Sequence, residues 1–304
     1  MNGSAWRLRA TAALAPLLVV GTGCPAPPLP PPEEILKALS YAILQPQTSC
    51  AELRDEFGLL DLPLVSNPGE VGIDYEQHLV VAPDGQALRL WYMPAPADRG
   101  WVIVSAGNTG PMECYLFTAR ILTGLGWSVV MYDYEGFGGS GGEPDLQTLR
   151  PSLETVLDWT LEQSGAKQVS LFGMSLGSIP TIAVASDRPE QVNAVILDSP
   201  VALAQEIERF GFLVRGRSKE ILAVLDPWMV TEVAIAGMHQ PMLVFIHEQD
   251  VVTPPGQVVL LLQRAPGPTR LVLFTGLGHA AGQFLRTVQY SANLNEFLTS
   301  VWEE

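Results

Sequence analysis

Basic side chains are scarce in this 304-residue sequence. It has 17 lysines and arginines against 32 aspartates and glutamates, which gives a formal net charge of −15 at pH 7. Proteins that bind nucleic acid depend on basic patches that replace the counterions of the phosphates. We therefore expect no nucleic-acid partner.

Cysteine is also rare, and three in the chain are too few for a scaffold built from disulfides. The sequence has no H-E-x-x-H motif and no paired cysteine or histidine spacing of the kind that binds zinc. It therefore predicts no metal site.

The apolar run at residues 10–20 is far shorter than the about 20 residues that a membrane-spanning helix needs. It follows Arg7 and Arg9 and precedes small residues, which is typical of a secretory signal peptide. The segment V-G-T-G-C that ends at Cys24 resembles the lipobox of bacterial lipoprotein signals. It departs from that pattern at Gly21, where such signals usually carry leucine or another larger aliphatic residue.

This resemblance implies that residues 1–23 are a signal peptide and that Cys24 is lipidated and becomes the mature N-terminus. An ordinary signal peptide cleaved nearby is the alternative. The proline-rich residues 24–34 favour an extended polyproline II conformation and would form a linker. An anionic membrane would repel so acidic a body, so we expect lipid chains to hold it at a bacterial membrane, outside the cytoplasm.

The remaining two cysteines are Cys50 and Cys114. In an oxidising compartment they can form a disulfide, but sequence does not fix their separation, and two buried free thiols are the alternative.

Short strands and amphipathic helices alternate through the body of the chain. Continuously apolar runs such as V-I-V and L-V-F-I are typical of strands buried on both faces, and P-D-G at residues 83–85 predicts a hairpin before them. Apolar residues recur at helical spacing behind Ser152, which we expect to be an N-cap. The sequence predicts one α/β domain over residues 35–304 with a mostly parallel, eight-stranded sheet. The expected strands are residues 77–82, 87–92, 101–105, 127–132, 168–172, 194–197, 242–246 and 270–274.

The motif G-x-S-x-G occupies residues 173–177, between a predicted buried strand and a helix. This spacing places Ser175 on a tight turn, where the flanking glycines avoid Cβ clashes and the hydroxyl stands above the sheet. Free N–H groups at the start of the helix suit a developing oxyanion. Ser175 is therefore a candidate nucleophile rather than a helix cap.

A serine nucleophile needs a base and an acid, in the chain order Ser, acid, His. His279, in G-L-G-H-A after the last predicted strand, is the best placed of the four histidines. Asp250 follows the M-L-V-F-I strand and is our candidate for the acid that orients the imidazole. Asp198 and Glu248 are the competing acids.

Taken together, residues 71–302 resemble the α/β-hydrolase superfamily, and within it the small serine-aminopeptidase-like and depalmitoylase-like serine hydrolases. The resemblance implies an α/β-hydrolase fold, with helices on both faces of the sheet and a short helical cap at about residues 201–240. It rests on five segments in family order, namely M-Y-D-Y-E-G-F-G-G-S-G-G-E-P at residues 131–144, G-M-S-L-G, L-D-S-P, Q-D-V-V-T-P-P and G-L-G-H-A.

The resemblance also implies an oxyanion hole made by the backbone N–H groups of Leu176 and of Asn108 or Thr109. Relatives usually carry His-Gly-Asn before this position, whereas this chain has Ala106 in place of the histidine. The loop matters for the rate, because losing one oxyanion donor costs about 3 to 4 kcal/mol in barrier.

Residues 136–141, G-F-G-G-S-G, formally match the dinucleotide fingerprint G-x-G-x-x-G. That fingerprint requires a helix to begin within the motif, and Gly142, Glu143, Pro144 and Asp145 follow instead. We interpret the segment as a glycine turn beside the active-site mouth and expect no cofactor.

These patterns lead to the hypothesis of a serine hydrolase that forms an acyl-enzyme on Ser175 and cleaves an ester or thioester. An acyltransferase with the same triad is a close alternative. A non-catalytic binding or assembly protein on a hydrolase fold is the rival, and the missing oxyanion-loop histidine favours it. The apolar cap suits an acyl-chain or aromatic substrate, although its packing onto the core would explain the same residues.

Overall fold

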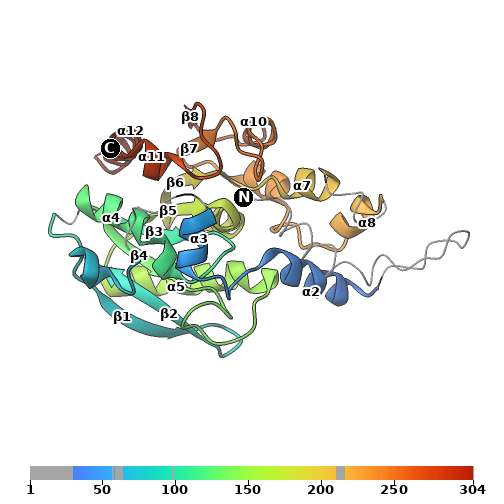
Figure 1. Ribbon diagram of the computed structural model, residues 1–304, viewed down its shortest axis with the longest axis horizontal. Coiled ribbons are helices and arrows are strands. Elements are labelled where there is room, and N and C mark those ends of the chain that lie inside the picture. The colour runs from blue at the N-terminus through green and yellow to red at the C-terminus, as the bar shows by residue number, and fades with distance from the viewer. Residues whose placement is uncertain (1–29, 57, 59–63, 98, 210–215, 304) are drawn as a thin grey trace, which may run out of the picture.

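The computed structural model describes residues 30–303 except 57, 59–63, 98 and 210–215, so the predicted signal peptide and Cys24 lie outside the described residues. Its centre is an eight-stranded sheet of order β1-β2-β4-β3-β5-β6-β7-β8 (Figure 1). The strands are β1 (Glu76–Val81), β2 (Ala87–Met93), β3 (Trp101–Ser105), β4 (Ser128–Tyr132), β5 (Val169–Met174), β6 (Val192–Asp198), β7 (Met242–His247) and β8 (Thr269–Phe274).

The sheet is mostly parallel. The hairpin β1–β2 is antiparallel, β2 pairs antiparallel with β4, and the pairings from β4 through β3, β5, β6 and β7 to β8 are parallel. Every expected strand is found within two residues of its predicted ends. The predicted α/β-hydrolase fold class is confirmed.

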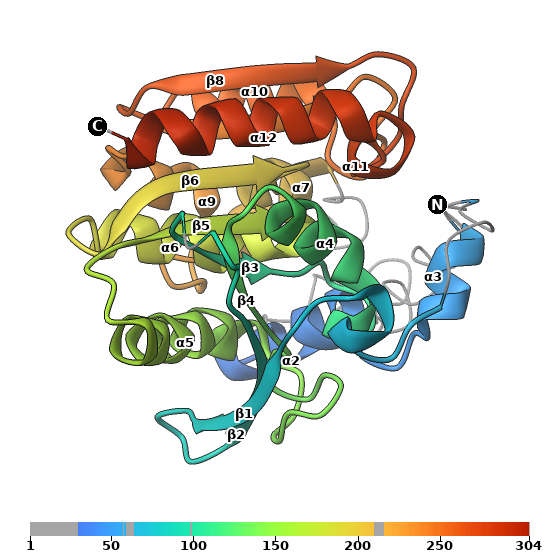
Figure 2. The same ribbon diagram turned by 90° about the vertical axis from the view of Figure 1, so that its left-hand side faces the viewer.

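Helices cover both faces of the sheet, which explains why its central strands are apolar throughout. In β3, Ile103 packs into the core on one face, and Val102 and Val104 pack into the core on the other. In Figure 2, α4 and α12 lie in front of the sheet and α6 and α10 lie behind it. The main helices are α4 (Leu116–Gly124), α5 (Leu149–Ser164), α6 (Ser178–Asp187), α10 (Pro255–Leu262) and α12 (Thr287–Trp302).

The prediction that Ser152 caps a helix was wrong. Helix α5 begins three residues earlier, and Ser152 is a buried residue inside it. The reason is Asp145, whose carboxylate accepts a hydrogen bond from the Gln147 N–H and starts the short 3₁₀ helix η4 (Leu146–Thr148) that leads into α5.

The glycine-rich residues 136–141 form a turn closed on itself, as the Gly136 N–H donates to the Gly141 carbonyl at 2.8 Å. Gly138 has φ +48° and lies against Asp133, leaving no room for a Cβ atom. The next helical residue of the chain is Leu146 in η4, so no helix begins within the motif.

An N-terminal segment packs onto this core. It contains α2 (Pro32–Ile43) and α3 (Cys50–Glu56). Cys50 is joined by a disulfide to Cys114, which lies in the 3₁₀ helix η3 (Met112–Tyr115), so the structure contains the bridge that the sequence left open. The disulfide ties the segment to the chain just after β3.

Between β6 and β7 the described residues form short helices and no strand, as expected of a cap. These helices are α7 (Leu203–Arg209), α8 (Ser218–Leu222), α9 (Thr231–Ala234) and η7 (Ile235–Gly237). Residues 210–215 of the expected cap range lie outside the described residues. Within the described part of the chain, no helix combines the length and the apolar character that a membrane span requires.

Candidate active site

Ser175 stands on a sharp turn directly after β5. It has φ +50° and begins the 3₁₀ helix η5 (Ser175–Gly177) that runs into α6. A Cβ atom on Gly173 would lie 2.7 Å from the Gly177 carbonyl oxygen, and one on Gly177 would lie 2.1 Å from the Ser105 carbonyl oxygen. Both positions therefore require glycine, and the turn can form only because the motif supplies it.

Three predicted side chains meet at this turn. The Ser175 Oγ is 3.0 Å from His279 Nε2, and the other ring nitrogen, Nδ1, is 2.8 Å from Asp250 Oδ2. Ser175 follows β5, Asp250 follows β7 and His279 follows β8. Because parallel strands end at the same edge of a sheet, their loops bring the three groups into one hydrogen-bonded chain.

Asp250 is buried, and both of its carboxylate oxygens accept hydrogen bonds. Its Oδ1 accepts the backbone N–H groups of Val252 and Thr253, each at 2.9 Å, and its Oδ2 accepts the Thr253 hydroxyl at 2.8 Å. Burial alone would raise the pKa of Asp250, but its hydrogen bond to His279, the charge of that ring and the bonds from Thr253 lower it. An ionised Asp250 fixes the proton of His279 on Nδ1 and leaves Nε2 as an acceptor toward Ser175.

The two competing acids lie elsewhere. Asp198 accepts a 2.7 Å hydrogen bond from the Tyr290 hydroxyl and is 3.8 Å from His247 Nδ1. Glu248 is exposed and accepts the backbone N–H of Gly276 at 2.8 Å. His78, on β1, pairs with Glu76 of the same strand.

The side chains of Ser199 and His247 hold the loop that carries His279. The Ala280 N–H donates to the Ser199 hydroxyl at 3.1 Å, and the Gly282 N–H donates to His247 Nε2 at 3.0 Å. The His247 Nδ1 lies 3.0 Å from the same Ser199 hydroxyl. Since Nε2 is an acceptor, the ring is neutral with its proton on Nδ1, and burial, only partly offset by the charge of Asp198, lowers the pKa of His247.

Backbone strain is concentrated in the same place. Among the described residues, the non-glycine residues with positive φ are Ser175, Ser199 and Ala280. Ser175 is the predicted nucleophile. Ser199 and Ala280 are joined by the hydrogen bond from the Ala280 N–H to the Ser199 hydroxyl, directly after His279 in the chain. Such strained residues cluster where a structure must hold a functional geometry.

The turn that carries the predicted donor Leu176 contacts the chain shortly before the other predicted donor, Asn108. The elbow packs against the end of β3, since the Cα of Gly177 leaves no space for a Cβ beside the carbonyls of Ser105 and Ala106. The side chain of Asn108 is engaged elsewhere, because its Nδ2 donates to the Ile43 carbonyl at 2.8 Å. Among the described hydrogen bonds of loops and turns, none uses the backbone N–H of Asn108 as a donor.

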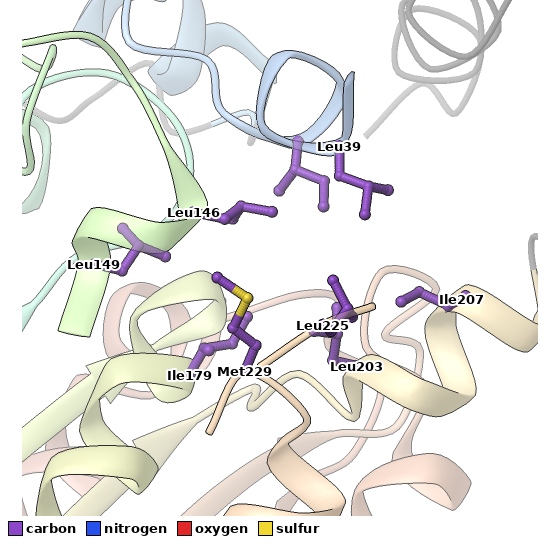
Figure 3. A pocket seen from close by; sticks show the side chains of 9 residues that line it. Leu39, Leu146, Leu149, Ile179, Leu203, Ile207, Leu225 and Met229 are labelled. Atoms are coloured by element: carbon purple, nitrogen blue, oxygen red, sulfur yellow. The ribbon is translucent and has the colours of Figure 1, made fainter. Parts of the chain in front are cut away.

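A small apolar pocket lies between α2 and the cap, with Ile179 of α6 in its lining. In Figure 3, Leu39 points from α2 toward Leu203 and Leu225 of the cap, with Ile179 and Met229 on the far side. The lining consists of leucine, isoleucine and methionine side chains, namely Leu39, Ile43, Leu146, Leu149, Ile179, Leu203, Ile207, Leu225 and Met229.

Several residues of this site were not found from the sequence. Thr253 lies within the motif Q-D-V-V-T-P-P, and Ser199 within L-D-S-P, but neither motif by itself says that the side chain supports His279. The sequence did contain a feature that could have pointed to His247: it is one of only four histidines, and it ends the strand that precedes Asp250.

The chain is similar in sequence to a family of serine hydrolases and to individual proteins. A family model described as serine aminopeptidase, S33, matches residues 96–231. An uncharacterized protein of Mycobacterium tuberculosis is 30% identical over 227 residues, which are 73% of this chain and 78% of that protein. The lysophosphatidylserine lipase ABHD12 of Mus musculus is 29% identical over 185 residues, 55% of this chain and 46% of the lipase.

Solved structures are similar in fold. An esterase of Pyrococcus furiosus superposes with a TM-score of 0.66 at 17% identity, covering 79% of this chain and 95% of the esterase. At that identity the likeness establishes the architecture and leaves the substrate to other arguments.

Proposed function

The chain belongs to the α/β-hydrolase superfamily, and on that premise we propose that it is a serine hydrolase that cleaves a carboxylic ester or thioester through an acyl-enzyme on Ser175. The observation that carries the proposal is the unbroken hydrogen-bonded chain from the Ser175 hydroxyl through His279 to Asp250. A relative named a lysophosphatidylserine lipase supports an acyl ester over an amide.

In the proposed reaction, the Ser175 Oγ attacks the substrate carbonyl carbon while His279 Nε2 takes the hydroxyl proton. Asp250 holds the ring in the tautomer that can accept this proton and stabilises the imidazolium that results. The oxyanion of the tetrahedral intermediate would be bound by the backbone N–H groups of Leu176 and Asn108. His279 then protonates the leaving alcohol or thiol, and water, activated by the same ring, releases the acid and restores Ser175.

Labelling with a fluorophosphonate probe tests this function. The folded protein should be labelled at Ser175, as located by peptide mass, and a heat-denatured sample should not be labelled. Ser175→Ala should abolish both labelling and hydrolysis of short p-nitrophenyl esters. A well-folded sample that shows neither labelling nor hydrolysis would contradict the proposal and favour a non-catalytic binding role.

We also propose that the enzyme acts outside the cytoplasm and is anchored to a bacterial membrane by lipid on Cys24. The lipobox-like V-G-T-G-C segment supports this, and the Cys50–Cys114 disulfide fits an oxidising compartment. Cells fed an alkyne-tagged fatty acid should label the wild-type chain, and Cys24→Ala should abolish the label and release the protein from the membrane fraction. Equal labelling of the two chains would contradict the anchor.

A further inference from the structure

We propose that residues 43–50, which lead from the end of α2 into α3, position the backbone N–H of Asn108 for the oxyanion of the reaction. We call this segment the strap, and the loop that it contacts, residues 106–111 between β3 and η3, the oxyanion loop. The inference rests on the proposed function and adds the groups that hold one wall of the oxyanion hole. The family match begins at residue 96, so it assigns no role to the strap.

The strap and the oxyanion loop pair through their backbones. Gln45 and Thr109 form an isolated parallel β-bridge. The Gln45 N–H donates to the Asn108 carbonyl at 2.8 Å, and the Gly110 N–H donates to the Gln45 carbonyl at 2.9 Å. These two bonds hold the peptide groups on both sides of Thr109, which is the residue directly after the proposed donor.

The side chain of Asn108 adds a third bond to the strap. Its Nδ2 donates to the Ile43 carbonyl at 2.8 Å, and its Oδ1 accepts the Thr109 hydroxyl at 3.0 Å. Ile43 is the last residue of α2, where a helix leaves carbonyls without a partner inside the helix. An amide side chain suits this place because it can donate and accept at the same time. Asn108 is therefore tied to the strap by both its side chain and its carbonyl.

The strap and the oxyanion loop are also in direct contact farther along the strap. Gly110 has φ +69°, and a Cβ atom on it would lie 2.7 Å from the Thr48 carbonyl oxygen and 3.0 Å from Cys114 Sγ. The position therefore requires glycine. Just after Thr48, the disulfide from Cys50 to Cys114 joins the end of the strap to η3, the helix that follows the loop. The strap is thus fixed by hydrogen bonds at its start and by a covalent bond at its end.

Two buried tyrosines hold the oxyanion loop from the core side. The Tyr134 hydroxyl donates to the Ala106 carbonyl at 2.7 Å, and the Tyr115 hydroxyl donates to the Thr109 carbonyl at 2.8 Å. The core therefore holds residues before and after Asn108, and the strap holds Asn108 itself. An oxyanion donor is most effective when it is fixed in advance, about 2.7–3.1 Å from where the oxyanion forms, because no reorganisation is then needed. The rate should therefore depend on the strap.

A proline at position 45 tests the inference. Gln45→Pro deletes the N–H that donates to Asn108, and Leu44, with φ −81° and ψ 132°, suits the residue before a proline. Removing one oxyanion donor costs about 10²- to 10³-fold in kcat, so kcat for p-nitrophenyl acetate should fall on the order of 10²-fold, with KM within about threefold. Gln45→Ala, the matched control, keeps the N–H and the carbonyl and should keep the wild-type kcat.

Asn108→Ala serves if the proline variant does not fold. It removes the bond to Ile43 and keeps the backbone N–H, and it should lower kcat at least ~10-fold, because a small misplacement of a catalytic group is costly. Rates are divided by the concentration of sites that fluorophosphonate labels at completion, so that unfolded protein does not count. A loss that disappears on this normalisation in both variants would mean that the strap only stabilises the fold, and would overturn the inference.

Inhibition by trifluoroacetophenone, a trifluoromethyl ketone, reports on the oxyanion hole directly. The Ser175 Oγ bonds to the carbonyl carbon of this ketone, the carbonyl oxygen becomes an oxyanion, and His279 takes the serine proton. Because the adduct resembles the tetrahedral intermediate, its Ki should rise in both variants by about the factor by which kcat/KM falls. Wild-type Ki and kcat in both Gln45→Pro and Asn108→Ala would overturn the inference.

Hydrogen exchange separates this inference from the proposed function. The Gly110 N–H, which is bonded to the Gln45 carbonyl, should exchange faster in Gln45→Pro than in Gln45→Ala, whether or not the protein is an enzyme. A wild type with neither labelling nor hydrolysis would sink the proposed function, even if the loop is released in this way. An active wild type whose kcat and Ki survive the release of the loop would sink the role of the strap alone.

Discussion

The ring of His247 accepts a 3.0 Å hydrogen bond from the backbone N–H of Gly282, three residues past His279. The two residues lie in different loops, and the bond is fully buried. Together with the bond from Ala280 to Ser199, it fixes the backbone on the C-terminal side of the proposed base. His247 is therefore a positioning residue, which acts through the loop and not on the substrate.

Replacing His247 should damage the rate more than substrate binding. His247→Leu removes the acceptor and leaves a buried N–H unpaired, which costs about 1–3 kcal/mol in the free energy of unfolding. Without this bond the loop can shift the His279 ring. A shift of a catalytic group by about 1 Å can lower the rate on the order of 10²-fold, so we expect kcat to fall by that order with KM nearly unchanged. Steady-state kinetics normalised to labelled Ser175 measure this. His247→Gln, which keeps an acceptor, should recover part of kcat, and a variant whose normalised kcat stays at the wild-type value would refute the role.

Asp250→Asn should lower kcat by about 10³- to 10⁴-fold, because an amide can donate to His279 Nδ1 and stabilise the wrong tautomer. Glu248→Gln is the matched control, since it removes a carboxylate two residues away that bonds to Gly276 and not to His279. Its kcat on p-nitrophenyl butyrate should stay within about threefold of the wild type. Similar losses in both variants would mean that Asp250 is not the orienting acid.

The disulfide between Cys50 and Cys114 should be a major source of stability. It closes a loop with a sequence separation of 64, for which chain entropy gives about 4 kcal/mol. Urea unfolding followed by circular dichroism should show a loss of about 2–4 kcal/mol for the double variant Cys50→Ser, Cys114→Ser. Dithiothreitol should destabilise the wild type to a similar extent and leave the double variant unchanged. Equal stability of the two chains would contradict this prediction.

Glu135 should make stability depend on pH. Burial, followed by the charges of Asp84 and Asp145, raises the pKa of Glu135 to about 7. The folded state then holds this proton more tightly than the unfolded chain, so the free energy of unfolding falls as pH rises from about 4.5 to 7.

Glutamine imitates the protonated form of this side chain. Glu135→Gln should therefore be more stable than the wild type at pH 8, by on the order of 2 kcal/mol, and about equal to it at pH 5. Glu143→Gln, at an exposed neighbour, should change stability at neither pH. Urea unfolding at the two pH values is the measurement, and a stabilisation of the same size at both would show that ionisation is not the cause.

Local patterns made most of the fold predictable. Continuous apolar runs marked the buried strands because both faces of a parallel sheet are covered. The nucleophile turn was equally readable from the G-x-S-x-G spacing, although only Gly173 is required by residues close in the chain, and Gly177 is required by the distant carbonyls of Ser105 and Ala106. Ser152 shows the limit of this approach, because a better cap at Asp145 started the helix early and the sequence offered both.

Contacts between distant segments were not predictable in the same way. Sequence named Cys50 and Cys114 but could not give the 4.9 Å between their Cα atoms. It placed α2 in the folded domain, but nothing in the helix itself indicated that Leu39 would line a pocket together with residues of α6 and the cap.

The sequence by itself determined which chemical groups stand at the ends of which strands, because strand pattern, glycine spacing and chain order are all local properties. Only the tertiary structure decided which acid faces His279, what holds that loop from behind, and which helix closes the pocket. Those outcomes depend on the sheet order and on side-chain packing between loops far apart in the chain. The free energy of each such contact depends on both segments together, so it cannot be read from the sequence of either one.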